Sequence, residues 1–213
     1  HLDYHGTMEH YYEAKKKLFS MCDTAVINFD DPYGKQLLKE FSEKALSCSI
    51  ESDVADYTAR EIRYEADASR FMLLGKGQIA RVHLHIPGAF SVANAMTAAG
   101  VCLALGLTFE QVAQGLDSCP GVVGRAEVLQ TDTPFTVIRD YAHSPDGLEK
   151  IITTMKPFAK GRVITLFGCA GNRDRGKRRL MSEIVARHSD FVILTSDNPR
   201  DEDEMQIIED AMP

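Results

Sequence analysis

Residues Val163–Arg200 read VITLFGCAGNRDRGKRRLMSEIVARHSDFVILTSDNPR, and this stretch decides the fold. Two short apolar runs, Val163–Phe167 and Phe191–Thr195, are typical of buried parallel strands. The amphipathic segment Arg179–Arg187 joins them, so the pattern predicts a strand–helix–strand unit. Open α/β sheets bind ligands at the carboxyl ends of their strands, and we therefore expect a site in the two loops that follow these strands.

The two predicted loops, 168–177 and 196–200, differ in charge. The first loop and the start of its helix carry four cations, Arg173, Arg175, Lys177 and Arg178. The second loop contains Asp197, Asn198 and Arg200. This combination suits a ligand that carries both carboxylates and amines. The first loop also fits the phosphate-binding pattern GxxxxGK, but an arginine stands where magnesium requires Ser or Thr, which disfavours a phosphate-binding loop.

The composition limits the class of protein. The 213 residues are 44% hydrophobic and 26% charged, as in an ordinary globular protein, and the net charge of −7 argues against a general nucleic-acid binder. Five scattered cysteines without CxxC spacing indicate reduced thiols and a cytoplasmic protein. No apolar run reaches the ~18 residues of a membrane span, so we expect no membrane partner. The first residue, His1, is not an initiator methionine, and we expect a piece of a larger protein.

Upstream of the boundary that we predict near residue 123, strand patterns of two kinds occur. A β-strand–helix–β-strand rhythm over residues 24–50 predicts a parallel sheet, and alternating segments over residues 59–86 predict a small antiparallel meander. An Ala-rich helix, Ala89–Leu105, follows and contains Asn94, which either lies at the surface or reaches a ligand. A hinge at Gly121–Arg125 divides the chain into predicted domains 1–123 and 124–213.

Near the amino terminus, Thr7 is a suitable N-cap for a helix over Met8–Cys22. Lys15 falls on the apolar stripe of this helix, whereas Lys16 and Lys17 point elsewhere. A lysine on such a stripe extends to solvent, pairs with an anion or loses its proton, and a neutral lysine can take up carbon dioxide as a carbamate. The periodicity leaves these alternatives open.

Downstream of the hinge, a strand at residues 136–140 ends in Asp140 and is followed by His143. Ser144 and Pro145 are typical of the N-cap and first position of the next helix. The order of elements from here to the end predicts the start of a doubly wound, Rossmann-like α/β domain.

Together these stretches resemble the Mur ligases of bacterial cell-wall synthesis, and most closely the members that add the third amino acid. The resemblance spans nearly the whole chain in the family's order and rests on HLDYHGTMEHYYEAKKKLF, the helix around Phe90–Asn94, GRAEV, IRDYAHSPDGLEK, FGCAGNRDRGKRRLM and SDNPR. It implies the later part of a central ATPase domain, with a parallel sheet and a small antiparallel sheet, followed by part of a Rossmann-like C-terminal domain.

The resemblance also implies a reaction. ATP phosphorylates the D-glutamate carboxylate of UDP-N-acetylmuramoyl-L-alanyl-D-glutamate, and the amine of meso-diaminopimelate attacks the acyl phosphate to form an amide. Mg²⁺ ions neutralise the crowded oxyanions. The family's phosphate-binding loop has no counterpart in this chain, so we expect the 213 residues alone to be inactive.

Carried over by matching motifs, the resemblance assigns roles to individual residues. Lys15 matches a carbamylated lysine that helps hold magnesium, and His1 matches a histidine near that ion. The matches at the nucleotide site are Asn94, Arg125 and Asp140. The matches at the substrate cleft and the diaminopimelate site are His143, Arg173, Asp197, Asn198, Pro199 and Arg200.

Three alternatives stay open at this point. An L-lysine-adding relative is disfavoured by Arg200, because members that add L-lysine typically have no arginine there. A folylpolyglutamate synthase is disfavoured by the DNPR and DYAHSPD stretches. A non-catalytic module that binds an amino acid through the diaminopimelate half-site alone is the third.

Overall fold

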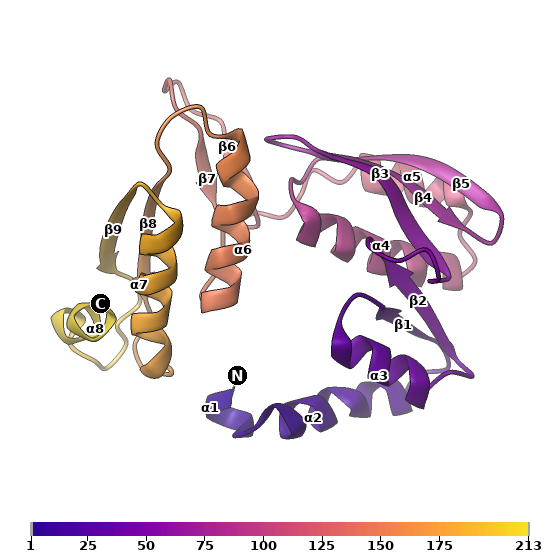
Figure 1. The fold of residues 1–213 in the computed structure, drawn as a ribbon, viewed down its shortest axis with the longest axis horizontal. Coiled ribbons are helices and arrows are strands. Elements are labelled where there is room, and N and C mark those ends of the chain that lie inside the picture. Colours follow the sequence, from indigo (N-terminus) through magenta and orange to yellow (C-terminus); the bar gives the residue numbers. More distant parts are fainter. Residues whose placement is uncertain (1, 213) are drawn as a thin grey trace. The chain divides into compact units, whose positions relative to one another are not determined.

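The computed structural model describes residues 2–212, and the chain divides into two compact units, unit 1 (residues 1–123) and unit 2 (residues 124–213) (Figure 1). The strands of unit 1 are β1 (Ala25–Asn28), β2 (Ala45–Ser49), β3 (Tyr57–Tyr64), β4 (Ser69–Gly75) and β5 (Gln78–Leu84). Its helices are α1 (Leu2–His5), α2 (Met8–Ser20), α3 (Pro32–Glu40), α4 (Ala89–Ala104) and α5 (Phe109–Asp117).

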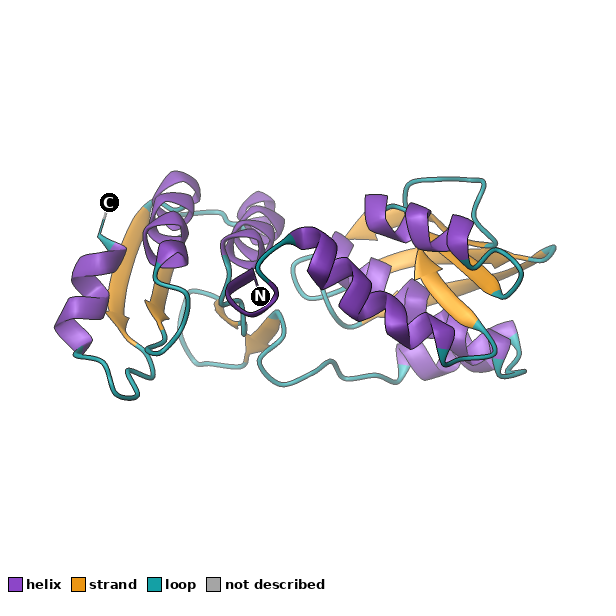
Figure 2. Cartoon of the chain, turned by 90° about the horizontal axis from the view of Figure 1, so that it is seen from below, coloured by secondary structure: helices purple, strands orange, loops and turns teal. Residues whose placement is uncertain are grey.

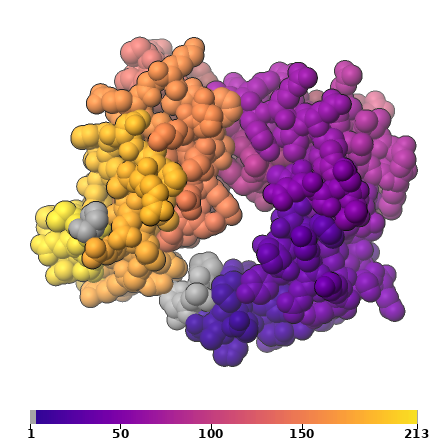
Figure 3. Space-filling view, viewed as in Figure 1, coloured from indigo at the N-terminus to yellow at the C-terminus, as the bar shows by residue number. Residues whose placement is uncertain are grey.

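Unit 2 contains residues 163–200, the stretch with two apolar runs and a cationic loop. Its strands are β6 (Glu127–Leu129), β7 (Val137–Arg139), β8 (Ile164–Cys169) and β9 (Phe191–Ser196). Its helices are α6 (Pro145–Met155), the short 3-10 helix η1 (Lys156–Phe158), α7 (Gly176–His188) and α8 (Glu204–Ala211). Figure 3 shows the surfaces of the two units, coloured along the chain. None of the helices within residues 2–212 is long and apolar enough to cross a bilayer.

The sheet of unit 1 combines the two predicted strand patterns in one layer with the order β1-β2-β3-β4-β5. Strands β1, β2 and β3 are parallel, and β3, β4 and β5 are antiparallel. Strand β3 joins the two halves, because its first residues, Tyr57 and Thr58, pair with the end of β2, and the strand also pairs with β4 on both sides of an irregularity between Arg60 and Arg63. The parallel and antiparallel parts are therefore continuous.

Helix α4 packs on this sheet through a face of small and apolar residues. Val92 and Met96 are completely buried there. Gly100 lies so close to the sheet that a Cβ atom would come within 2.7 Å of Cys48 Sγ. The Ala-rich sequence thus forms a helix whose close approach to the sheet depends on the absence of side-chain volume at one position.

The strands β8 and β9 of unit 2 are parallel (Figure 2). Their register pairs Ile164 with Phe191 and Cys169 with Ser196. The core beside them contains Leu148, Ile152, Phe167, Cys169, Met181, Val185, Ile207 and Ala211. The strand–helix–strand prediction is confirmed for β8, α7 and β9. Strand β7 lies outside this pair, because within the described residues it pairs with β6 in an antiparallel hairpin. The short connection between β6 and β7 permits a hairpin, whereas a parallel pairing requires a long crossover.

Candidate functional site

Two loops leave the same edge of the β8–β9 pair and are tied together by hydrogen bonds. We call residues 170–175 the β8–α7 loop and residues 197–203 the β9–α8 loop. The Gly171 amide donates to the Asn198 carbonyl at 2.8 Å. The Asn172 amide donates to Glu202 Oε1 at 2.6 Å, and its side chain donates to Asp201 Oδ2 at 2.9 Å. The structure thus brings the predicted residue Arg173 and the predicted run 197–200 into one loop pair.

Backbone geometry within the loop pair is tight. Gly171 is buried, and a Cβ atom there would lie 1.8 Å from the Pro199 carbonyl oxygen, so only glycine permits this approach. Asn172 and Arg200 adopt positive φ angles of 53° and 54°, which residues with a Cβ rarely occupy. The turn of the β9–α8 loop is closed by the Glu202 amide, which donates to the Pro199 carbonyl at 3.0 Å.

A network of charged groups fixes the loop pair to its neighbouring helices. The Arg178 side chain is only 2% exposed and lies between Glu202, at 2.8 Å, and Asp210, at 2.7 Å. Arg175 also pairs with Glu202, at 2.9 Å. Lys177 approaches Asp174 at 3.8 Å. Of the four cations of this region, Arg178 does not face solvent, because α7 begins at Gly176 and turns its side chain inward.

The network shifts the protonation equilibria of its members. Glu202 accepts hydrogen bonds from Arg178, the Asn172 amide and Arg175, and these lower the pKa of Glu202 to about 2. The bond from Arg178 has the largest effect. The same contact with Glu202 raises the pKa of Arg178 above its ordinary value. Glu202 is thus an anion and Arg178 a cation at neutral pH.

Two cations of the loop pair remain available to a ligand. The side chains of Arg173 and Arg200 are exposed, and within residues 2–212 neither makes a hydrogen bond or ion pair. Each guanidinium offers several donors in a fixed fork that matches a carboxylate. The arrangement suits recognition of an anionic group by two arginines from different loops.

A second group of predicted residues meets where β6 begins and β7 ends. Asp140 accepts hydrogen bonds from the Ala126 and Ala142 amides, each at 2.8 Å. The Arg125 guanidinium lies over the Tyr141 ring, 5.2 Å from its centre. The His143 Nδ1 atom lies 3.0 Å from the Tyr141 carbonyl oxygen. The structure therefore gathers Arg125, Asp140 and His143, and it shows that the Asp140 carboxylate organises the backbone on both sides.

Helix α2 begins as predicted, because Thr7 Oγ1 accepts from the His10 amide at 3.2 Å. The prediction about its lysines is wrong. Lys15 is exposed, with its ammonium 5.6 Å from the centre of the Tyr11 ring. Lys16, which was expected to point away, is the partly buried lysine.

The reason lies in which residues of α2 reach the neighbouring helix α3. Tyr12 is buried and donates to Glu40 Oε1 at 2.9 Å. Lys16, one turn later on the same face, pairs with Glu40 at 2.8 Å and with Glu13 at 3.0 Å. Hydrogen bonds from Lys16, Gln36 and Tyr12 lower the pKa of Glu40 to about 2. Burial, and then the bond to Glu40, raise the pKa of Tyr12 to about 12.

The remaining predicted positions are less constrained. Asn94 is exposed on α4. His1 lies outside the described residues. Among residues 2–212, no group of three or more His, Cys, Asp or Glu side chains is placed to hold a metal ion.

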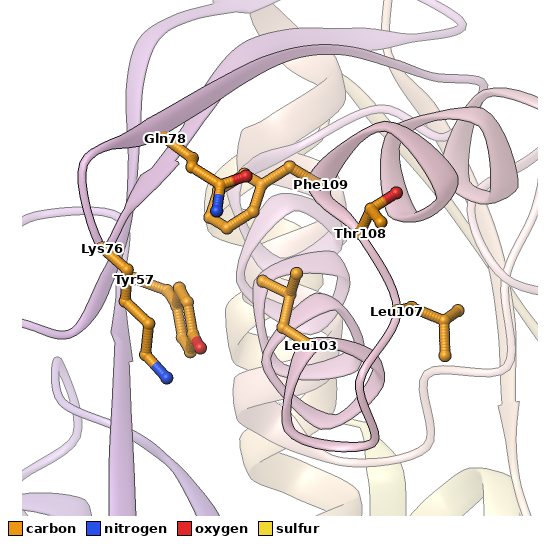
Figure 4. A pocket seen from close by; sticks show the side chains of 7 residues that line it. All are labelled: Tyr57, Lys76, Gln78, Leu103, Leu107, Thr108 and Phe109. Atoms are coloured by element: carbon orange, nitrogen blue, oxygen red, sulfur yellow. The ribbon is translucent and has the colours of Figure 1, made fainter.

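A shallow pocket of about 230 Å³ lies elsewhere in unit 1 (Figure 4). Tyr57, Lys76, Gln78, Leu103, Leu107, Thr108 and Phe109 line it. None of the predicted site residues is among them. The Lys76 ammonium lies 5.8 Å from the centre of the Tyr57 ring, so this lysine covers an aromatic side chain at the rim.

Sequence reasoning missed the anchoring role of Arg178, Glu202 and Asp210. One signal was available, because Arg178 shares a helical face with Met181, Ser182 and Val185, which are buried. An arginine at that spacing predicts a buried cation, and a buried cation requires acidic partners. The acidic run that follows the DNPR stretch supplies one of them.

Comparison with known proteins agrees with this architecture. Residues 1–102 match the family model described as Mur ligase middle domain, and residues 124–213 match the model described as Mur ligase, glutamate ligase domain. The UDP-N-acetylmuramoyl-L-alanyl-D-glutamate–2,6-diaminopimelate ligase of Clostridium tetani is 41% identical over 214 aligned residues, which cover 100% of this chain and 44% of that protein. The chain thus spans less than half the length of this curated relative.

Solved Mur ligase structures share the fold of this chain. A structure of a UDP-N-acetylmuramoyl-L-alanyl-D-glutamate–2,6-diaminopimelate ligase superposes with a TM-score of 0.66 at 35% identity, covering 99% of this chain and 44% of that one. The MurF ligase of Thermotoga maritima, solved in complex with ADP, has a TM-score of 0.73 at 21% identity, covers 97% of this chain and 48% of that one, and supports the fold alone. Two family models and a relative 41% identical over the whole chain show that this chain belongs to the Mur ligase family.

Proposed function

We propose that the protein containing this chain is a cytoplasmic, ATP-dependent ligase that joins meso-diaminopimelate to UDP-N-acetylmuramoyl-L-alanyl-D-glutamate in peptidoglycan synthesis. The observation that carries the proposal is the pair of exposed arginines, Arg173 and Arg200, on two loops that are tied together. The names of the relatives agree with this substrate. Residues 1–123 would form the later half of a central ATPase domain, and residues 124–213 the first part of a C-terminal ligase domain.

The proposed roles of the other residues follow the family motifs. Asn94, Arg125 and Asp140 would bind ATP, and His143 would line the substrate cleft. Asp140 would act in part through the backbone turn that it holds beside Arg125. Lys15 as a carbamate, together with His1, would help to hold Mg²⁺. Bound Mg²⁺ would supply charge neutralisation for the phosphoryl and carboxyl oxygens.

Substrate choice would rest on the β9–α8 loop. Asp197, Asn198 and Pro199 would shape the subsite, and Arg200 would form a bidentate pair with the second carboxylate of meso-diaminopimelate. A hydrogen bond to a charged partner contributes about 1.5–3 kcal/mol. L-lysine has no second carboxylate, so it would leave Arg200 desolvated and unpaired in a closed site. Discrimination would therefore exceed the strength of the contact itself.

The test compares kcat/KM for meso-diaminopimelate and L-lysine in the full-length enzyme, with the other substrates saturating. We expect a preference for meso-diaminopimelate on the order of a hundredfold or more, and loss of most of it in both Arg200→Ala and Arg200→Lys, because lysine cannot reproduce the fork. The exposed Arg187 on α7, changed to alanine, is the matched control and should keep the preference. Equal use of L-lysine by the wild type would favour an L-lysine-adding relative.

A further inference from the structure

We propose that Glu202 is a positioning residue that clamps the β8–α7 loop to the β9–α8 loop, so that Arg173 and Arg200 address one substrate molecule together. This inference rests on the proposed function and adds to it a residue that makes no contact with the substrate. It starts from the observation that Glu202 belongs to one loop while its partners belong to the other loop and to α7.

The clamp consists of three donors that converge on one carboxylate. The Asn172 amide and the Arg178 guanidinium both donate to Glu202 Oε1, at 2.6 and 2.8 Å. The Arg175 guanidinium donates to Glu202 Oε2 at 2.9 Å. A bond to a backbone amide fixes the path of the chain itself, so this contact places the residue that immediately precedes Arg173.

The anchor of the clamp is buried. Arg178 is 2% exposed, and its second ion pair, with Asp210, connects Glu202 to helix α8. Removal of one partner would leave a buried charge poorly compensated, whereas the intact set holds a single geometry. The side chain of Glu202 is itself only 17% exposed.

Backbone conformation gives the clamp a function beyond stability. Two residues with positive φ angles lie at the free guanidinium groups. Asn172 directly precedes Arg173, and Arg200 itself carries the second guanidinium. Such angles persist only where surrounding contacts impose them. Hydrogen bonds from Asn172 to Glu202 and to Asp201 supply that constraint across the loops. Loss of the clamp would let both loops relax and would separate the two arginines.

The experiment compares Glu202→Gln with two further variants of the full-length enzyme. Glu209→Gln, on the exposed side of α8, is the matched control for removing a carboxylate. Asp201→Ala removes only the outer link to Asn172 and leaves Arg178 with both of its partners. This variant tests whether the placement of Asn172 between the loops affects substrate recognition, even where Glu202→Gln fails to fold.

The kinetic prediction separates positioning from general stability. We expect Glu202→Gln to raise KM for meso-diaminopimelate by about tenfold or more and to reduce its preference over L-lysine similarly. Asp201→Ala should show a smaller change in the same direction, and KM for ATP should change less than about twofold in each variant. A purely structural defect would lower kcat for both amino acids equally and leave the KM values and the preference unchanged.

A readout without catalysis completes the test. Hydrogen–deuterium exchange of the peptide that contains Gly171 and Asn172 should be slow in the wild type, faster in Glu202→Gln and unchanged in Glu209→Gln. Unchanged exchange and unchanged preference in Glu202→Gln and Asp201→Ala would overturn the clamp. A wild type that does not use meso-diaminopimelate, but whose exchange responds to Glu202→Gln as expected, would overturn the proposed function and leave the link between the loops standing.

Discussion

Single residues in unit 2 divide the positive charge between two tasks. Arg175 and Arg178 donate hydrogen bonds to Glu202 and Asp210. The guanidinium groups of Arg173 and Arg200 are exposed and available to solvent or a ligand. The buried Arg178 guanidinium needs acidic partners, whereas the exposed Arg175 is paired because it lies beside Glu202. The residues around each arginine therefore decide whether its guanidinium holds the loops or stays available to a ligand.

The Glu202 carboxylate predicts a pH dependence of stability. Its folded-state pKa of about 2 lies below the ordinary 4.5, so its contribution is fully present above about pH 4.5 and is lost as the pH falls toward 2. We expect the difference in free energy of unfolding between wild type and Glu202→Gln to shrink as the pH falls below 4.5. Denaturant titrations of unit 2 at pH 7, 4 and 3 would measure it. A difference that stays constant across this range would contradict the assigned role of the charge.

Lys15 predicts a chemical rescue. The exposed position of this lysine on α2 leaves room for a carbamate, and we expect Lys15→Ala to lose most of the activity of the full-length enzyme. Short-chain carboxylic acids should restore part of it by replacing the carbamate. The exposed neighbour Lys17, changed to alanine, should retain activity. Wild-type turnover in Lys15→Ala would show that this lysine only covers the Tyr11 ring.

At the scale of elements, the connection between β8 and α7 depends on one glycine. Because a Cβ at position 171 would lie 1.8 Å from the Pro199 carbonyl oxygen, Gly171→Ala must push the two loops apart. We expect a loss of about 1–3 kcal/mol in the free energy of unfolding of unit 2, in the range of other overpacking substitutions. Thermal and denaturant unfolding would measure this loss.

Gly161 supplies the control for that substitution. Apart from its own residue and its two chain neighbours, a Cβ built at Gly161 meets no described atom within 4 Å, so Gly161→Ala should change the free energy of unfolding little. Equal effects of the two substitutions would show that the close approach of the loops does not matter for stability.

Elements were predictable from the sequence wherever periodicity and end signals agreed. The apolar runs of β8 and β9 and the Ser144–Pro145 start of α6 appear where the sequence places them. The partner of β7 was not predicted, because the apolar pattern of a short strand does not specify which neighbouring strand it pairs with. The structure pairs β7 with the preceding strand β6, and the cross-strand ion pair of Arg139 and Glu127 at 2.8 Å supports this hairpin.

The sequence indicated where the candidate site lies, but not which of its side chains are buried or paired with one another. The rule that ligands bind at the carboxyl ends of strands led to the loops of Arg173 and Arg200. The errors concern residues for which one turn of helix decides the environment. Lys15 and Lys16 differ by about 100° around α2, and only the position of Tyr12 against α3 determines which lysine is covered.

For the whole molecule, the two units have separate cores. Met96 is buried in the core of unit 1, and Met181 in the core of unit 2. Met96→Ala and Met181→Ala should each reduce the free energy of unfolding of the unit that contains the residue by about 2–5 kcal/mol. Hydrogen exchange followed by mass spectrometry would assign the loss to β3 and β4 in the first case and to β8 and β9 in the second. Equal loosening of both units by either change would show that they unfold as one.

The unpaired side chain of Arg200 has an evolutionary consequence. The backbone of the β9–α8 loop is held by Gly171, Glu202 and the turn at Pro199, and none of these contacts involves the Arg200 guanidinium. A mutation in this one codon can therefore change the chemical group presented at the rim without a second mutation to repair the loop. We expect lineages that incorporate different third amino acids to differ at this position first and to retain the residues that hold the loop.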